Sequence, residues 1–252
     1  MSDLVTSEVK NGILTVRMNR ADKKNALNLE MYEALATAIK DADSNPDVRV
    51  IVITGSGDSF CAGNDLKDFT ENPPSEKNSP VVNFLKAISG AETPIVAAVN
   101  GTAVGIGTTM LLHCDFVYVS KDATLSLPFI NLGLVPEAAS SLLLPRLAGQ
   151  ARAAELLMLG EPFTAKDALD IGIANAVCEP ADLEATAMKT AKKLAAKPRD
   201  ALRQTKALLR RDFETVAQRM DAEAKEFKKA LVSPDAKEAL LAFKEKRKPK
   251  FN

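Results

Sequence analysis

Two short apolar runs, residues 48–54 and 94–99, each lead into a glycine-bearing turn, and this pairing constrains the fold more than any other feature of the chain. The first turn spans residues 61–65 (CAGND) and the second spans residues 101–107 (GTAVGIG). Short apolar runs bounded by glycine are typical of buried strands in a parallel sheet. Glycine permits positive φ and close backbone approach, so N–H groups of both turns can point into one space, as in an oxyanion hole. The alternative is that both are ordinary strand-to-helix turns.

Strand and helix signals alternate along the first half of the chain. Strands are predicted at 13–18, 48–54 and 94–99, and a helix at 29–42 with Asn28 as its N-cap. This alternation predicts an α/β fold built from crossover units around a mostly parallel sheet. Further elements are predicted by the same patterns: helices near 81–88 and opening at 105–107, and strands at 116–119 and 124–126.

The second half is predominantly helical. Apolar spacing predicts helices at 151–159, 165–171, 183–194, 199–231 and 234–246. The apolar faces of the last two need cover, and such a tail often finds it in a partner subunit. The polar segment 70–80 is either a solvated connector or a lid.

Composition excludes several functional classes. Lys plus Arg and Asp plus Glu number 33 each, so no global charge favours nucleic acid or a membrane surface. The three cysteines, Cys61, Cys114 and Cys178, are far apart and His113 is the only histidine, so no metal site is expected. No apolar run reaches the roughly 20 residues of a membrane helix. The unpaired cysteines, the lack of a signal segment and a C-terminus unlike a peroxisomal address predict a cytoplasmic protein.

Glu137 is the best candidate for a catalytic base. It follows Pro136 as a lone carboxylate in a segment that is otherwise apolar from residue 125 to 144. Burial raises a carboxyl pKa, which makes a stronger base and then a competent proton donor. The alternative is a glutamate that interacts with the first turn of its own helix. His113, among apolar neighbours, is expected to be a helix residue with a satisfied ring.

Two basic segments are candidates for binding an anionic ligand. Residues 19–27 place Arg20, Lys23 and Lys24 in a loop just after a predicted strand, and residues 243–250 form a basic end. Either could hold phosphates. Exposed charge runs more often remain solvated, so both interpretations stay open.

Taken together, these motifs resemble the crotonase, or enoyl-CoA hydratase/isomerase, superfamily along nearly the whole chain. The resemblance rests on residues 19–27, 59–66, 100–107, 114–115, 128–133 and 243–249, in this order. Within the superfamily, residues 60–66 and 132–141 are most similar to the Δ3,Δ2-enoyl-CoA isomerases of the peroxisomal type.

The resemblance implies a spiral of ββα units over residues 1–195 and a helical trimerisation region over residues 196–252. It also implies a homotrimer or a dimer of trimers, and an acyl-CoA substrate with no separate cofactor. The charge balance and the apolar runs predict no nucleic-acid or membrane partner. The motif positions place the oxyanion-hole N–H groups on Asn64 and Ile106. The residues implied in acyl-CoA binding are Arg20, Lys23, Lys24, Ala26, Ala62, Gly63, Asn64, Asp65, Leu66, Gly105, Phe243 and Lys246, the last two from a neighbouring subunit.

One departure from the family pattern bears on the reaction. Hydratases of this superfamily carry two glutamates at positions that here hold Thr109 and Phe129, whereas the isomerase glutamate falls on Glu137. The resemblance therefore implies isomerisation of a 3-enoyl-CoA by a single-glutamate proton shuttle. The alternatives are enoyl-CoA hydration or another crotonase-type activity, and a non-catalytic acyl-CoA-binding or RNA-binding protein.

Overall fold

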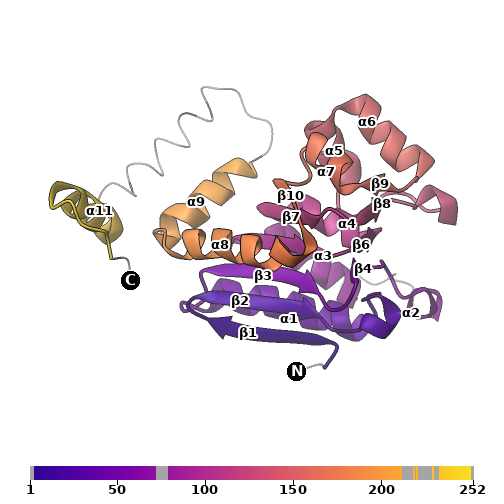
Figure 1. Ribbon diagram of the computed structural model, residues 1–252, viewed down its shortest axis with the longest axis horizontal. Helices are drawn as coiled ribbons and strands as arrows, with labels where there is room; N and C mark the ends of the chain where they lie inside the picture. Colours follow the sequence, from indigo (N-terminus) through magenta and orange to yellow (C-terminus); the bar gives the residue numbers. More distant parts are fainter. Residues whose placement is uncertain are drawn as a thin grey trace. The chain divides into compact units, whose positions relative to one another are not determined.

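The computed structural model describes residues 3–71, 79–211, 218, 220, 229 and 233–250 (Figure 1). The chain divides into two compact units, Met1–Ala191 and Lys192–Asn252. The division falls inside helix α8 (Leu183–Ala195), four residues before the boundary expected from the sequence. The first unit is an α/β body and carries the elements described next.

A six-stranded sheet forms the centre of the first unit. Its strand order is β1-β2-β3-β5-β7-β10, and every pair is parallel except β1 with β2. The strands span β1 (Val5–Lys10), β2 (Ile13–Met18), β3 (Val50–Gly55), β5 (Ile95–Val99), β7 (Phe116–Ser120) and β10 (Ala176–Cys178). The predicted strands at 13–18, 48–54, 94–99 and 116–119 are thus confirmed to within two residues.

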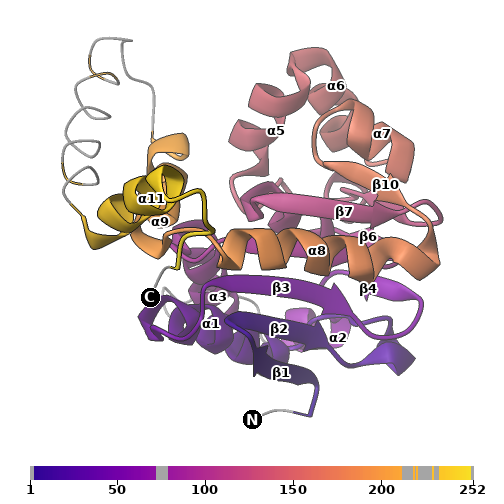
Figure 2. The same ribbon diagram turned by 60° about the vertical axis from the view of Figure 1, so that its left-hand side comes forward.

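Helices cover both faces of this sheet (Figures 1 and 2). The buried core on one face comprises alternate strand residues, such as Val16, Ile53 and Ala97, packed with α1 (Leu29–Ser44) and α3 (Pro80–Gly90). The intervening residues, such as Arg17 and Val52, face the first half of α8. Successive side chains of a strand point to opposite faces of the sheet, so alternate residues pack against the helices on each face. As predicted, the Asn28 side chain caps α1 by accepting from the N–H of Met31 at 2.9 Å.

A smaller sheet, in the order β4-β6-β8-β9, repeats the connectivity of the larger one. It comprises β4 (Ser59–Cys61), β6 (Thr102–Val104), β8 (Thr124–Ser126) and β9 (Phe163–Thr164). Three times in succession, a strand of the large sheet is followed by a strand of the small sheet and then by a helix. These three turns are the ββα spiral, because β3, β5 and β7 lie side by side and so do β4, β6 and β8.

The helices of the first unit are more broken than the sequence patterns predict. The helix after the second glycine turn is α4 (Ile106–Thr109) followed by a 3₁₀ turn, η2 (Met110–His113). The helix predicted at 151–159 is α6 (Gln150–Ala154) followed by a π-helical turn, η4 (Glu155–Leu159). The other helical elements are η1 (Ala21–Lys23), α2 (Leu66–Glu71), η3 (Ile130–Leu132), α5 (Ser140–Ala148), α7 (Ala165–Asp170) and η5 (Pro180–Asp182).

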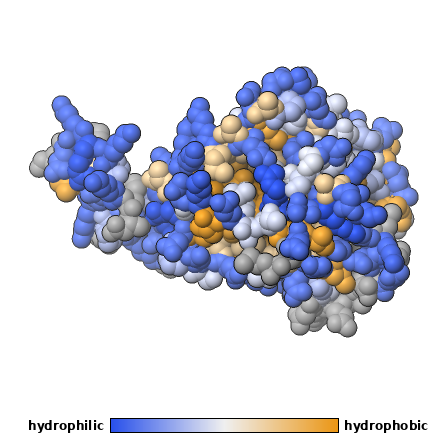
Figure 3. Space-filling model, turned by 60° about the horizontal axis from the view of Figure 1, so that its bottom comes forward, coloured by the Kyte–Doolittle hydropathy of each residue, from blue (hydrophilic) through white to orange (hydrophobic). Residues whose placement is uncertain are grey.

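The second unit contains the end of α8 together with α9 (Arg199–Leu209) and α11 (Pro234–Lys244). Most of the predicted helix 199–231 beyond Leu209, and residues 72–78 of the predicted connector, lie outside the described residues. Hydrophilic side chains predominate on the face drawn in Figure 3, with apolar ones in small patches between them. Of the helices described, none is both long enough and apolar enough to cross a membrane.

Candidate active site

The carboxyl ends of β4, β6 and β8 meet at one edge of the small sheet, because the three strands are parallel. The first glycine turn follows β4 there, whereas the predicted turn 101–107 contains β6 itself and turns only at residues 105–107; the two segments pack closely. A Cβ on Gly107 would lie 2.3 Å from the carbonyl oxygen of Cys61, and one on Gly63 would lie 3.1 Å from that of Val104. Only glycine allows this contact, so the structure brings together the two turns that the sequence pairs.

Each turn has one backbone N–H group, that of Asn64 or of Ile106, that its local hydrogen bonds do not use. Asn64 forms a parallel bridge with Leu27, in which Gly63 O accepts from Leu27 N and Asp65 N donates to Leu27 O, both at 2.8 Å. A parallel bridge uses only the neighbours of Asn64, so its own N–H faces the opposite side. Ile106 is the first residue of α4, and N–H groups of a first helical turn have no acceptor within the helix.

Glu137 lies in the loop between η3 and α5, and its carboxyl group is mostly buried. Its Oε1 atom is buried without a hydrogen-bond partner among the residues described. Burial raises the pKa of Glu137 from its ordinary 4.5 to about 7, with no second charged group as a cause. The Oε1 atom is therefore not hydrogen-bonded to the first turn of α5. A buried carboxyl that is half ionised near neutral pH suits a general base.

The loop that carries Glu137 has an unusual backbone. Ala138 and Ala139 both have positive φ, of 52° and 55°. The carbonyl of Glu137 accepts hydrogen bonds from the N–H and hydroxyl of Ser140, and the carbonyl of Ala138 lies 2.8 Å from His113 Nε2. Since a carbonyl can only accept, His113 must carry a proton on Nε2. The hydrogen bond from the His113 ring thus helps to hold the left-handed backbone of Ala138 and Ala139. This backbone conformation costs about 1–2 kcal/mol per alanine.

Two buried side chains experience the charge of Glu137. Burial raises the pKa of the Cys61 thiol to about 12, and Glu137 adds to the rise, while the pKa of Tyr32 is raised well above its usual value by the same two causes. Glu137 is therefore close to the end of β4, where Cys61 lies, and to α1, where Tyr32 lies. A thiol with such a pKa stays protonated at neutral pH, so Cys61 is unsuited to be a nucleophile.

The basic loop predicted to bind phosphates lies against the first glycine turn. Lys24 O accepts from Ala62 N at 3.0 Å. Arg20 Nη1 donates to Asp65 Oδ2 at 2.7 Å and to Ala26 O at 3.0 Å. This ion pair lowers the pKa of Asp65, and it joins two residues that were both predicted to bind the acyl-CoA.

The predicted lysines are exposed. Lys23 and Lys24 are exposed on the basic loop, as phosphate ligands would need to be. Lys246 is exposed in the second unit, and the side chains of Leu66 and Phe243 lie outside the described part of the chain. Within that part, no group of three His, Cys, Asp or Glu side chains is placed to hold a metal ion.

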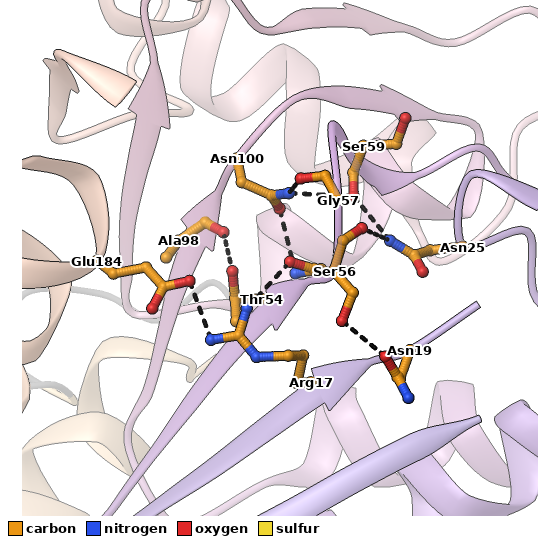
Figure 4. Close-up of polar contacts among 11 residues, drawn as sticks. Arg17, Asn19, Asn25, Thr54, Ser56, Gly57, Ser59, Ala98, Asn100 and Glu184 are labelled. Atoms are coloured by element: carbon orange, nitrogen blue, oxygen red, sulfur yellow. Dashed lines mark hydrogen bonds and ion pairs between the residues drawn. The ribbon is translucent and has the colours of Figure 1, made fainter. Parts of the chain in front are cut away.

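Two asparagines with no role predicted from the sequence, Asn25 and Asn100, hold the connection between β3 and β4 (Figure 4). Asn25 Nδ2 donates to Ser59 O at 2.7 Å and to Ser56 O at 2.9 Å, and its Oδ1 accepts from Arg20 N at 2.9 Å. Asn100 Nδ2 donates to the same Ser59 carbonyl at 3.2 Å. Both side chains thus fix the segment that enters β4 and its glycine turn.

Asn25→Ala is expected to lower the free energy of unfolding by about 3 kcal/mol. Asn25 is fully buried with φ of 56°, so alanine would leave several buried backbone groups unpaired and strain the backbone as well. Urea denaturation measures the loss. Asn11→Ala is the matched control, because Asn11 has φ of 53° but is exposed, and only about 1 kcal/mol of strain should appear there. Equal losses in both variants would contradict the role given to the side chain of Asn25.

Comparison with known proteins identifies the family of this chain. The family model described as enoyl-CoA hydratase/isomerase matches residues 8–252. A solved structure from Magnetospirillum magneticum AMB-1, named for enoyl-CoA hydratase/carnithine racemase, is 50% identical with a TM-score of 0.97, and the match covers 100% of both chains. The 1,2-epoxyphenylacetyl-CoA isomerase of Escherichia coli K12 is 33% identical over 100% of this chain and 99% of that protein. Enoyl-CoA delta isomerase 2 of Rattus norvegicus is 38% identical over 83% of this chain and 54% of that protein. The chain belongs to the enoyl-CoA hydratase/isomerase family, the crotonase superfamily.

Proposed function

We propose that this crotonase-superfamily enzyme is a Δ3,Δ2-enoyl-CoA isomerase. The observation that carries the proposal is the largely buried carboxylate of Glu137, whose pKa burial raises to about 7, close to the end of β4. A base that shuttles one proton between two carbons of the same substrate needs no second carboxylate. Relatives named as delta isomerases agree with this chemistry.

In the proposed reaction, the thioester oxygen of a 3-enoyl-CoA accepts hydrogen bonds from the N–H groups of Asn64 and Ile106. The carboxylate of Glu137 removes a proton from C2, and the electron pair delocalises into a dienolate with its negative charge on the thioester oxygen. The carboxylic acid then returns the proton at C4, which moves the double bond from C3 to C2. Each donor stabilises the dienolate by about 3 kcal/mol, a factor of about 100 in rate.

The residues at the two positions of the hydratase glutamates support isomerisation over hydration. Thr109 is fully buried in α4, and Phe129 is buried in the core, with a ring carbon 4.0 Å from where a Cβ of Gly105 would lie. Neither side chain can act as a general base toward water. Hydration remains the alternative function, because several relatives are named as hydratases, among them one from Syntrophomonas wolfei named crotonyl-CoA hydratase.

We also propose that the basic loop holds the phosphates of the CoA moiety. Lys23 and Lys24 are exposed, whereas Arg20 already pairs with Asp65 and would act by joining the basic loop to the glycine turn. The tail residues Phe243 and Lys246 would contribute from a neighbouring subunit of a homotrimer.

Product analysis tests the reaction. Purified protein incubated with a 3-enoyl-CoA should increase the ultraviolet absorbance of the conjugated 2-enoyl thioester, and the same protein should leave a 2-enoyl-CoA largely intact. Loss of the 2-enoyl signal at an equal or greater rate would replace isomerisation by hydration. Failure to turn over either substrate, with acyl-CoA still bound, would favour a binding protein.

The pH dependence of kcat/KM should report Glu137. The ionised form is the base, so activity is expected to rise with pH along a limb centred near 7 and to level off above it. Stopped-flow assays from pH 5 to pH 9 measure the limb. A limb centred near 4.5 would assign it to an exposed carboxylate instead.

The raised pKa of Glu137 also affects the stability of the protein, because the folded state binds more protons than the unfolded state. The stability that protonated Glu137 confers is present below about pH 4.5 and is lost as the pH rises through about 7.

A further inference from the structure

Tyr32 is a buried polar side chain that the proposed mechanism does not use. It lies in the first turn of α1 with 1% of its surface exposed, and its ring packs on Phe84 with centroids 5.5 Å apart. Its phenol donates a hydrogen bond to Oδ1 of Asn64, in the first glycine turn. Residues 32 positions apart in the chain are thus joined at the predicted oxyanion donor.

Asn64 is held by one segment at two points. Leu27, just before α1, bridges its backbone, and Tyr32, within α1, holds its side chain. Leu27 precedes the N-cap of α1 and Tyr32 lies in its first turn, so the start of this helix fixes the positions of both residues. The peptide that presents the Asn64 N–H is therefore fixed from its backbone and from its side chain.

The phenol is suited to this task because it stays protonated. Burial, and then the nearby charge of Glu137, raise the pKa of Tyr32 well above its usual value. A protonated phenol can donate to Asn64 Oδ1 over the whole pH range in which Glu137 titrates. The phenol uses one of the two lone pairs of Asn64 Oδ1, and this bond fixes the orientation of the amide.

We propose that Tyr32 is a positioning residue, which holds Asn64 so that its N–H faces the thioester oxygen of the substrate. The inference rests on the oxyanion role proposed for Asn64, but it does not depend on which crotonase reaction follows. Small displacements of a catalytic donor cost about 100-fold in rate per ångström. The hydroxyl of Tyr32, and not its ring, is the group that carries this role.

Tyr32→Phe tests the role, because it removes the hydroxyl and keeps the ring against Phe84. We expect kcat for the 3-enoyl-CoA to fall about tenfold, with KM changed less than threefold, since a loosened donor weakens stabilisation of the transition state. Tyr118→Phe is the matched control. Tyr118 is the other tyrosine of the chain, and its phenol lies 2.6 Å from Thr190 Oγ1, between β7 and α8. The kcat of the Tyr118→Phe variant should stay within twofold of the parent value.

A double-mutant cycle separates positioning from general loosening. Asn64→Ala keeps the backbone N–H but removes the acceptor of the phenol, so adding Tyr32→Phe to it should change kcat less than twofold. If the full tenfold loss persists in the Asn64→Ala background, or if Tyr32→Phe alone leaves kcat unchanged, the proposal is overturned.

A spectroscopic readout makes the test independent of the proposed reaction. A 3-oxoacyl-CoA bound in an oxyanion hole is stabilised as its enolate, which is detected by ultraviolet absorbance. Tyr32→Phe should raise the pH at which the bound ligand forms the enolate, and Tyr118→Phe should not. If the parent protein fails to isomerise a 3-enoyl-CoA but this shift is observed, the proposed function fails and the role of Tyr32 stands. An unshifted enolate signal in Tyr32→Phe overturns that role whatever the reaction.

Discussion

Replacing Glu137 by glutamine is expected to lower turnover of a 3-enoyl-CoA by about 10,000-fold, the upper end of what a general base contributes. The loss should be this large because one carboxyl group performs both the removal of the C2 proton and its return at C4. Glutamine keeps the size of the side chain, so the affinity for an acyl-CoA should stay within about tenfold. Steady-state kinetics and calorimetric titration with a saturated acyl-CoA measure the two quantities.

Glu155→Gln is the control for removing a carboxylate elsewhere. Glu155 is exposed and pairs with Arg152 at 2.7 Å on α6 and η4, where an ion pair contributes little to stability. Its variant should keep the parent rate. The Glu137 variant should also lose the pH limb near 7. An unchanged rate in Glu137→Gln would remove this residue from the mechanism.

Gly107→Ala is expected to lower kcat/KM by more than 100-fold, although it adds a single methyl group. The new Cβ would lie 2.3 Å from the carbonyl oxygen of Cys61 and 2.9 Å from its Cβ, and neither atom is the end of a flexible side chain. The two turns that carry the N–H groups of Asn64 and Ile106 would have to separate. A displacement of about 1 Å between paired donors suffices for a loss of this size.

Gly90→Ala is the matched control, because a Cβ at Gly90, the last residue of α3, would meet no atom within 4 Å. That variant should be neutral or slightly stabilised. Gly107→Ala should lower the free energy of unfolding by about 1–3 kcal/mol, through overpacking, and far-ultraviolet circular dichroism would confirm that it still folds. Activity within threefold of the parent would show that the two turns need not be in contact.

The buried strands β2, β3, β5 and β7 and the glycine turns were predictable because their signals are local, whereas the mostly exposed β1 was not predicted. The apolar runs before both turns become β3 and β5, and Asn28 caps α1, since each depends on a few consecutive residues. The three-residue strands β4 and β6 escaped prediction, unlike the equally short β8 at 124–126, because they overlap the segments that were interpreted as glycine turns. The π-helical turn η4 interrupts a pattern that reads as one continuous helix.

For the site, the sequence by itself determined which residues are available: one glutamate in an apolar segment, two glycine turns and a basic loop. The tertiary structure decided their state. Burial alone gives Glu137 a pKa of about 7, and Arg20 is paired with Asp65 and so not left entirely to a ligand. Tyr32 and His113 hold Asn64 and the loop of Glu137 from elements distant in the chain. Desolvation and contacts between distant segments arise only once the ββα turns have stacked, which is why no local pattern encodes them.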